Sequence, residues 1–405
     1  MTTWNLPYPV AVAGHICLDV IPAMRGTHES LQDVFVPGKL IDIGPAVLAT
    51  GGAVANTGLA LFRLGIPARL MGKIGDDWFG QTILGILRQH DPSLAEGMIV
   101  SPGEASSYSV VINPPGIDRM FLHCTGANDT FASDDVSDEA LRQVGLFHFG
   151  YPPLMRRMYE DDGTELALLM QRAKRAGATT SLDLARPDPA SDAGRADWRN
   201  ILKRVLPSVD LFLPSIEEIM FMLRREQYDT LSSNELSAYM NAELLSELTD
   251  ELIGMGAAVV ALKLGEYGLY LRTTSDEVRL AEAGRYAPGL QNEWAGRELY
   301  APCFKVSVAG TTGAGDCTIA GFLAGFAQGL SPEETMIGAV GTGACNVERP
   351  DSVSGIVPWE ALRERVAAGW RQHGTGDLLS GFEENPREGA VVWSGPNDAK
   401  GENRT

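Results

Sequence analysis

The sequence has few of the residues that mark metal-binding, secreted or nucleic-acid-binding proteins. Its 405 residues include five cysteines without a C-x-x-C pair, and six histidines without close pairing. This spacing indicates reduced cysteines and excludes a zinc-finger type of site. Lysine and arginine number 33 against 52 acidic residues, a net charge of -19, so nucleic acid and anionic membrane surfaces are unfavourable partners.

Long apolar runs are missing as well. No uninterrupted apolar stretch approaches the roughly 18 residues that a membrane helix needs. The segment from Met1 to His15 has neither a basic region nor a long apolar one. Hydrophobic residues still make up 44% of the chain, enough for a packed core. We therefore expect a soluble cytoplasmic protein with no membrane partner.

Short apolar segments alternate with amphipathic ones along most of the chain. Strands are expected at residues 9–14, 69–74, 146–149, 179–184, 210–213 and 257–264, and helices at 53–64, 78–90 and 165–175. This alternation predicts an α/β fold: a doubly wound, mostly parallel sheet with helices on both faces.

Two stretches, residues 18–42 and 104–126, interrupt this alternation and have a β-like composition. We expect them to form a small sheet that covers the carboxyl ends of the parallel strands as a lid. Residues 1–375 would then form one domain. Residues 376–405, rich in Gly, Asn, Pro and charge, are expected to be a loosely ordered C-terminal tail.

The run Gly-Thr-Thr-Gly-Ala-Gly-Asp at residues 310–316 carries most of the chemical information. It follows a β-like segment at 304–308 and opens a helix with apolar residues at 319, 322, 323 and 326. Glycines at 313 and 315 let backbone N–H groups converge, and a helix N-terminus favours a bound anion. Because the carboxylate of Asp316 lies beside this anion site, the run predicts phosphoryl transfer, with Asp316 taking the proton of an attacking hydroxyl.

Taken alone, the same run is also compatible with a tight strand-to-helix turn capped by aspartate. It is not a Walker P-loop, because no Lys-Ser/Thr pair follows the last glycine. It is not a dinucleotide fingerprint either, because position 318 is Thr and the run does not follow the first strand. A nicotinamide dehydrogenase is therefore excluded.

A second glycine-rich segment opens the first predicted helix, with Gly51 and Gly52 followed by Asn56, and a third spans residues 72–80. Together with Gly14 and Asp19, and in order with the late run at 311–325, these segments resemble the ribokinase-like (PfkB) carbohydrate kinase family. The resemblance covers about residues 9–370.

This resemblance implies a kinase that uses ATP and Mg²⁺ to phosphorylate a hydroxyl of a small sugar or sugar-like molecule. Asp316 matches the catalytic base, and Gly313, Ala314 and Gly315 match the anion hole for the transferred phosphoryl group. The other matched positions bind the sugar (Asp19, Gly52, Asn56 and, in the lid, Arg119), bind the nucleotide (Lys263, Gly265, Gly268 and Thr311) or organise Mg²⁺ through water (Glu218).

The chain departs from the family pattern at three positions. Gly310 stands where the family usually has Asp, at a monovalent-cation site. Ser215 replaces the Asn of the Asn-x-x-Glu motif, and Lys263 replaces a threonine on the nucleotide side. None of the three belongs to the base or the anion hole.

Two other functions stay open. A nucleoside kinase on the same scaffold would need a shelf for its base, which Tyr108, Phe121 and Tyr151 could supply. A catalytically silent sugar- or nucleotide-binding regulator is the other. Exposed edges of a lid sheet favour pairing with a second lid, so a homodimer is also expected.

Overall fold

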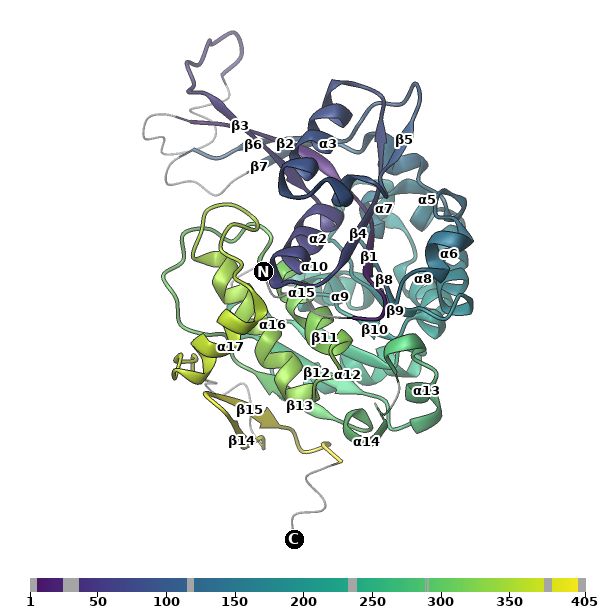
Figure 1. Cartoon of the computed structure of the whole chain (residues 1–405), viewed down its shortest axis with the longest axis vertical. Coiled ribbons are helices and arrows are strands. Elements are labelled where there is room, and N and C mark those ends of the chain that lie inside the picture. The colour runs from purple at the N-terminus through teal and green to yellow at the C-terminus, as the bar shows by residue number, and fades with distance from the viewer. Residues whose placement is uncertain are drawn as a thin grey trace.

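The computed structural model describes residues 6–24, 36–114, 120–231, 239–287, 289, 291–374 and 381–399. It confirms the predicted α/β fold: a large, mostly parallel sheet lies between two layers of helices, and a smaller sheet projects from one end (Figure 1). No helix in these ranges is both long and apolar enough to cross a bilayer.

Eleven strands of the described chain form the large sheet, in the order β14-β15-β13-β12-β11-β10-β9-β8-β1-β4-β5. The pairs from β5 across to β11 are parallel, and those from β11 to β14 are antiparallel. Their bounds are β1 (Val10–Gly14), β4 (Ala68–Gly75), β5 (Ile99–Ser101), β8 (Leu146–Gly150), β9 (Thr179–Leu182), β10 (Leu211–Phe212), β11 (Val259–Lys263), β12 (Leu269–Thr273), β13 (Glu298–Ala301), β14 (Glu383–Arg387) and β15 (Ala390–Ser394).

Both faces of this sheet are buried, and strand β1 shows why its sequence is continuously apolar. Val10 and Val12 pack into the core on one face, and Ala11 and Ala13 into the core on the other. Successive side chains of a strand point to opposite faces, so a strand covered on both sides needs apolar residues at every position.

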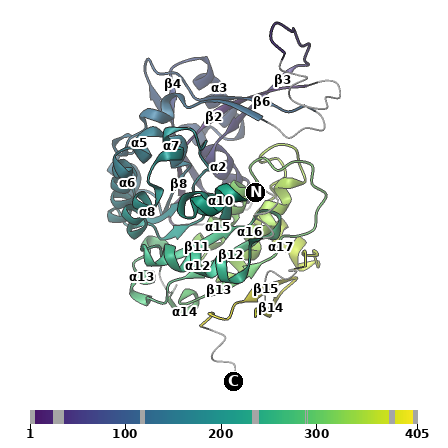
Figure 2. The same cartoon turned by 180° about the vertical axis from the view of Figure 1, so that it is seen from behind.

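The helices divide between the two faces, as the opposite views in Figures 1 and 2 show. One core contains residues of α2 (Ala53–Leu64), α3 (Trp78–His90), α15 (Ala314–Ala327), α16 (Pro332–Val347) and α17 (Trp359–Ala367). The other contains residues of α6 (Thr164–Arg175), α8 (Trp198–Val205), α9 (Ile216–Leu223) and α12 (Ala242–Gly254). Shorter helices complete the fold: α4 (Asp138–Arg142), α5 (Arg156–Tyr159), α7 (Asp192–Arg195), α10 (Arg225–Thr230), α13 (Glu277–Ala281) and α14 (Gln291–Trp294).

The small sheet consists of β3 (Ala46–Gly51), β2 (Cys17–Pro22), β6 (Tyr108–Ile112) and β7 (Met120–Cys124), in that order. Strand β2 comes from the first stretch that we expected to form a lid, and β6 and β7 come from the second, whereas β3 lies beyond residue 42. In Figure 1 these strands project away from the body at the upper left.

The C-terminal residues differ from the expectation of a loosely ordered tail. Strands β14 and β15 form an antiparallel hairpin, and β15 extends the large sheet by pairing with β13. Figure 1 shows them at the lower edge of the sheet. The expectation was wrong for residues 383–394, because the alternation of Val392 (buried) with more exposed neighbours is short and is masked by charged flanking residues.

The predicted strand at residues 304–308 is also wrong. Phe304 forms only an isolated bridge with Gln372. A β-like composition alone does not specify a pairing partner for the segment.

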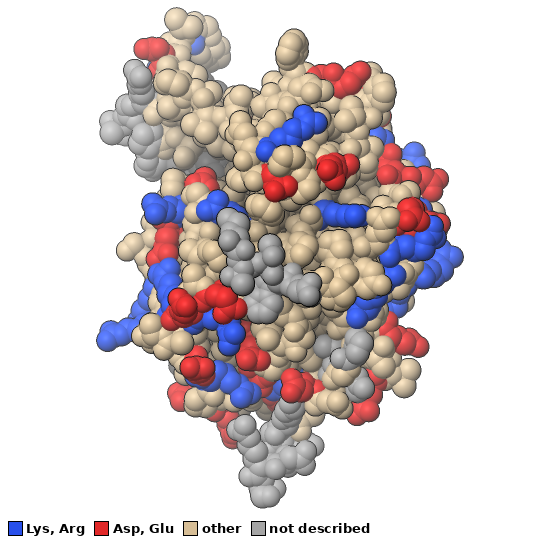
Figure 3. Space-filling model, viewed as in Figure 1, with Lys and Arg blue, Asp and Glu red and all other residues tan. Residues whose placement is uncertain are grey.

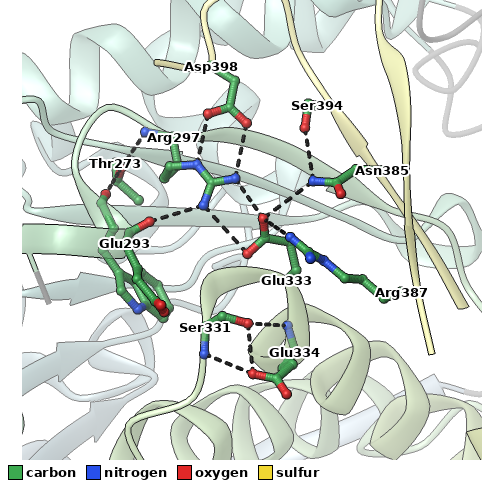
Figure 4. Close-up of polar contacts among 11 residues, drawn as sticks. Thr273, Glu293, Arg297, Ser331, Glu333, Glu334, Asn385, Arg387, Ser394 and Asp398 are labelled. Carbon is green, nitrogen blue, oxygen red and sulfur yellow. Dashed lines mark hydrogen bonds and ion pairs between the residues drawn. The ribbon is translucent and has the colours of Figure 1, made fainter. Parts of the chain in front are cut away.

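A buried ionic network attaches the C-terminal segment to the body (Figure 4). The guanidinium of Arg297, fully buried, lies 2.8 Å from Asp398 Oδ1 and 2.8 Å from Glu333 Oε1. Arg387 of β14 adds a second contact to Glu333 Oε1, at 2.6 Å. Burial opposes ionisation of Glu333, but hydrogen bonds and charge from Arg297 outweigh it and lower the pKa of Glu333 to about 2.

We predict that Arg297→Met destabilises the protein by about 3–5 kcal/mol, because it leaves two carboxylates buried without their main partner. Urea unfolding followed by circular dichroism measures this loss. Ionised Glu333 contributes stability above its ordinary pKa of 4.5 that is lost as the pH falls toward 2. The difference in the free energy of unfolding between the variant and the wild type should therefore become smaller as the pH falls from 4.5 toward 2.

Arg363→Met is the matched control. Its guanidinium is 4.0 Å from Glu360 on the surface, with 58% of the side chain exposed. Exposed pairs of this kind contribute about 0–1 kcal/mol, so this variant should unfold close to the wild type. Equal losses in the two variants would contradict a stabilising role for the network.

Candidate active site

The side chains of the candidate site come from the carboxyl ends of parallel strands. Tyr151 follows β8, Asp183 follows β9, and Lys263 ends β11. Asp316 approaches the same edge from the first turn of α15. These four residues line one cavity of about 680 Å³. Ligands of open α/β sheets bind at this edge.

The bend before α15 leaves backbone donors unused. Gly313 has φ 73°, a left-handed conformation that favours glycine, and it sets the direction of the helix. The first helical bond runs from the N–H of Cys317 to Gly313 O, at 2.8 Å. The N–H groups of Gly315 and Asp316 donate to no acceptor among the described residues. Both residues line the cavity, so two donors at a helix N-terminus are available to an anion there.

Asp316 is only 3% exposed, and its carboxylate has two defined partners. Asn56 Nδ2 donates to Oδ2 at 2.9 Å, and the Tyr151 hydroxyl lies 2.8 Å from Oδ1 and 2.9 Å from Oδ2. Burial raises the pKa of Asp316, whereas the hydrogen bonds from Asn56 and Tyr151 and the charge of Lys263 oppose the rise. Burial dominates, so the pKa of this carboxyl stays above its usual value.

Lys263 supplies a fixed positive charge beside the bend. Its ammonium lies 2.6 Å from Asp183 Oδ1, and a Cβ built on Gly315 would lie 4.0 Å from Nζ. Burial lowers the pKa of Lys263, but the carboxylates of Asp183, Glu218 and Asp316 outweigh it and raise the pKa. Burial also raises the pKa of Asp183, against the opposing charge of Lys263. The short contact favours an ionised pair, so we take Lys263 as a permanent cation.

Three of the four predicted nucleotide-side residues, Lys263, Gly265 and Thr311, line the same cavity. Gly268 does not line it. It closes the turn after β11 by accepting from the N–H of Leu264 at 2.8 Å.

Glu218, the predicted magnesium residue, also lines the cavity. It is the third residue of α9 and forms a capping box with Ser215: the Ser215 N–H donates to Glu218 Oε2 at 2.6 Å, and Ser215 Oγ accepts from the Glu218 N–H at 3.2 Å. No described group of three His, Cys, Asp or Glu side chains is placed to hold an ion directly. The magnesium role of Glu218 stays a prediction.

The predicted sugar-side residues lie where the lid meets the body. Asp19, on β2, faces the glycine pair: a Cβ built on Gly51 would lie 2.4 Å from Asp19 Oδ2. Gly52 is the N-cap of α2, and Asn56 one turn later reaches Asp316. Arg119 lies outside the described residues.

Two buried polar atoms at this side have no partner in the described chain: Asn56 Oδ1 and His15 Nδ1. His15 Nε2 lies 3.3 Å from His123 Nε2 of β7, a contact that joins the lid to the body. Buried polar atoms usually have partners, so these two are compatible with a polar ligand that carries hydroxyl groups.

Residues 10–359 match the description "pfkB family carbohydrate kinase", and the chain belongs to this family. It is 30% identical over 218 residues to "Probable fructokinase-4" of Arabidopsis thaliana, covering 53% of this chain and 62% of that protein. It is 25% identical to "Probable fructokinase-6, chloroplastic" of the same plant, over 90% of this chain and 84% of that protein.

Among solved structures, the fold is similar to that of Arabidopsis thaliana ribokinase complexed with ribose and ATP. The TM-score is 0.65 at 18% identity, over 88% of this chain and 98% of the other. At this identity the likeness shows the fold alone.

Sequence reasoning missed two roles at this site. It treated Tyr151 as a possible shelf for a base, whereas its hydroxyl is bonded to Asp316. It also did not pair Asp183 with Lys263. The one signal in the sequence was position: both Tyr151 and Asp183 directly follow buried strands, whose carboxyl ends meet at the same edge.

We predict that Asp316→Asn raises the stability of the protein at neutral pH by about 1 kcal/mol, as substitutions at strained functional sites commonly do. The amide oxygen can take the place of Oδ2 and accept from Asn56, and the variant no longer ionises a buried group. Because the folded-state pKa of Asp316 is raised, the wild type loses stability as the pH rises through it.

Thermal unfolding of both proteins from pH 8 downward measures this effect. The advantage of the variant should shrink as the pH approaches 3.8, the ordinary pKa of aspartate. A variant that is less stable than the wild type at every pH would show that burial does not penalise this carboxylate.

Proposed function

We propose that the protein transfers the γ-phosphoryl group of ATP to a hydroxyl of a small sugar or sugar-like molecule, with Asp316 as the base. One observation carries this proposal: a buried carboxylate lies at the same cavity wall as the two unused N–H groups of Gly315 and Asp316. Phosphoryl transfer needs these two elements, a proton acceptor for the hydroxyl and donors for the transferred group.

In this proposal the bend formed by Gly313, Ala314 and Gly315 receives the γ-phosphoryl oxygens. The N–H of Ala314 donates to Thr311 O at 3.3 Å, so the donors to the phosphoryl group are the N–H groups of Gly315 and Asp316. The helix N-terminus and the ammonium of Lys263 stabilise the charge on the γ-phosphoryl oxygens. Charge stabilisation and positioning account for most of the catalysis in such reactions, since the transition state is loose. Mg²⁺, organised by Glu218 through water, would neutralise further phosphate charge when it is bound.

The two ends of the cavity divide the binding roles. Lys263, Gly265, Gly268 and Thr311 would contact the nucleotide. Asp19, Gly52, Asn56 and Arg119 would hold the sugar hydroxyls. The unpartnered Asn56 Oδ1 supports this assignment, because a hydroxyl placed there would satisfy it.

The geometry supports an explanation for the departure at Gly310. A Cβ built on this residue would lie 2.9 Å from Pro350 Cα and 3.1 Å from Pro350 O, so a side chain has no room without a shift of backbone. The chain instead carries Lys263 beside the bend. We infer that this ammonium supplies positive charge without need of a monovalent-cation site at residue 310.

The lid supports a homodimer as part of this proposal. Four of its apolar side chains are about half exposed or more: Val47 (61%), Leu48 (49%), Phe121 (50%) and Leu122 (50%). Figure 3 shows few charged side chains on the visible face of the lid. A second lid that paired with this sheet would cover them. The homodimer and the cytoplasmic location both stay predictions.

We predict that Asp316→Asn lowers kcat by at least ~10²-fold and leaves ATP affinity largely intact, because the variant loses the general base but keeps the anion site. ATP consumption is measured with Mg²⁺ and a panel of sugars, sugar acids and nucleosides, and ATP affinity by thermal shift with a non-hydrolysable analogue. An acceptor at about 100 times its Kd should stabilise the protein by about 2.7 kcal/mol.

Cys317→Ala is the matched control in the next position of the helix. Its thiol donates to Ser352 O at 3.2 Å and is not among the hydrogen-bond partners of Asp316, so activity should stay near that of the wild type. Turnover of nucleosides but of no sugar would show that the acceptor is a nucleoside and not a sugar. Binding of sugar or ATP without turnover would indicate a silent regulator. More than half of the activity remaining in Asp316→Asn would refute its role as base.

A further inference from the structure

The hydroxyl of Tyr151 contacts both oxygens of the proposed base. It lies 2.8 Å from Oδ1 and 2.9 Å from Oδ2 of Asp316. Burial, followed by the charges of Asp316 and Asp183, raises the pKa of Tyr151 well above its ordinary value. The phenol therefore keeps its proton and acts as a donor to the carboxylate.

The backbone that presents Tyr151 is held in an unusual conformation. Tyr151 has φ 65° and ψ 41°, the left-handed region that residues other than glycine rarely adopt. It directly follows Gly150, whose carbonyl accepts from the N–H of His15 at 3.2 Å. A Cβ on Gly150 would lie 2.2 Å from Ala53 Cβ, so this strand end is tightly packed. Strain of this kind persists where surrounding structure enforces it, often at functional sites.

The two carboxylate oxygens of Asp316 are not equivalent. Oδ2 accepts from both Asn56 and Tyr151, whereas Oδ1 has only Tyr151 among the described residues. A phenol has one proton to share between the two oxygens, so Oδ1 retains lone-pair capacity for an acceptor hydroxyl. The Tyr151 contact also fixes the rotation of the carboxylate.

We propose that Tyr151 is a positioning residue that keeps Asp316 ionised and directs Oδ1 toward the acceptor hydroxyl. The inference rests on the proposed role of Asp316 as base. Hydrogen bonds to an ionised carboxylate favour its charged form, and here they oppose the penalty of burial. Without the phenol, Asp316 holds its proton to higher pH and is less often available as a base.

The effect of Tyr151 on the ionisation of Asp316 can be separated from the effects of the other groups around this carboxylate. Lys263 from β11 opposes the rise of its pKa, and Glu218 from α9 adds to it. Asp183 after β9 is paired with Lys263. Burial lowers the pKa values of His15 and His148 to about 3, so both stay neutral over the working range. From α2, Asn56 contributes an amide that does not titrate.

The first test is the pH profile of kcat/KM for Tyr151→Phe, measured as ATP consumption with whichever acceptor of the panel the wild type turns over. The acidic limb should move to higher pH. On that limb the activity should fall about 10-fold relative to the wild type, and on the alkaline plateau by less than about 2-fold. An unchanged limb overturns the proposal. Higher activity of the variant with an unchanged acidic limb also overturns the proposal, because the Tyr151 hydroxyl would then compete with the acceptor hydroxyl for the carboxylate of Asp316.

Tyr270→Phe is the matched control. Its hydroxyl donates to another buried carboxylate, Glu298 Oε1, at 2.5 Å, far from the bend in sequence. This variant should lower Tm and leave the pH profile in place. A Tyr270→Phe profile that shifted as much as that of Tyr151→Phe would show a general loss of rigidity instead of a local effect on Asp316.

The second test needs no acceptor, so it separates this inference from the proposed function. The destabilisation caused by Tyr151→Phe is measured by urea unfolding across pH, in the wild-type background and in Asp316→Asn. It should be larger at pH 8 than near pH 4 in the first background, and independent of pH in the second. If no acceptor is turned over but this pattern appears, the proposed function fails and the Tyr151 contact stands. Equal pH dependence in both backgrounds overturns the contact as a control on Asp316.

Discussion

The ammonium group of Lys263 lies among carboxylates at the edge of the central sheet. The candidate site depends on the balance between this positive charge and the negative charges around it. The ammonium is paired at 2.6 Å with Asp183, and its charge opposes the rise in the pKa of Asp316 that burial causes. Removing charges from water is costly, so three acidic groups could not share this cavity without a cation and hydrogen-bond donors nearby. Asn56 and Tyr151 supply the donors for Asp316. Together these groups oppose the rise in the pKa of Asp316 that burial causes.

The elements that meet at this point were largely predictable from the sequence. Apolar periodicity gave α2 as 53–64 and α3 as 78–90, the bounds that the structure has. The bend at 310–316 and its helix followed from glycine spacing and one apolar face. These are local signals, and local signals are what a single sequence carries with least ambiguity. The same holds for the position of Asp316 in the first turn of that helix, which the structure confirms.

The parts that could not be predicted depend on contacts between distant segments. Strand β15 pairs with β13 through Leu299 with Ser394 and Tyr300 with Trp393, which are far apart in sequence, and nothing in its five residues specifies that partner. The segment 304–308 has the composition of a strand, but Phe304 forms only an isolated bridge with Gln372. Tyr151 reaches Asp316 only because Gly150 ends a strand beside α2. The local sequence around each of these residues does not specify which distant segment the residue contacts.

Helix α16 contacts both the C-terminal strands and the segment that leads into the bend at residues 310–316. At its first turn, Glu333 binds Arg297 and Arg387, so that β14 and the body hold this end of the helix. At its last residue, the carbonyl of Val347 accepts from the N–H groups of Ala309, at 2.8 Å, and Gly310, at 3.3 Å. Those two residues lead directly into the bend. A helix that is fixed at one end by buried charge therefore holds, at its other end, the backbone that sets the direction of the free N–H groups. The C-terminal hairpin is thus part of the support of the site.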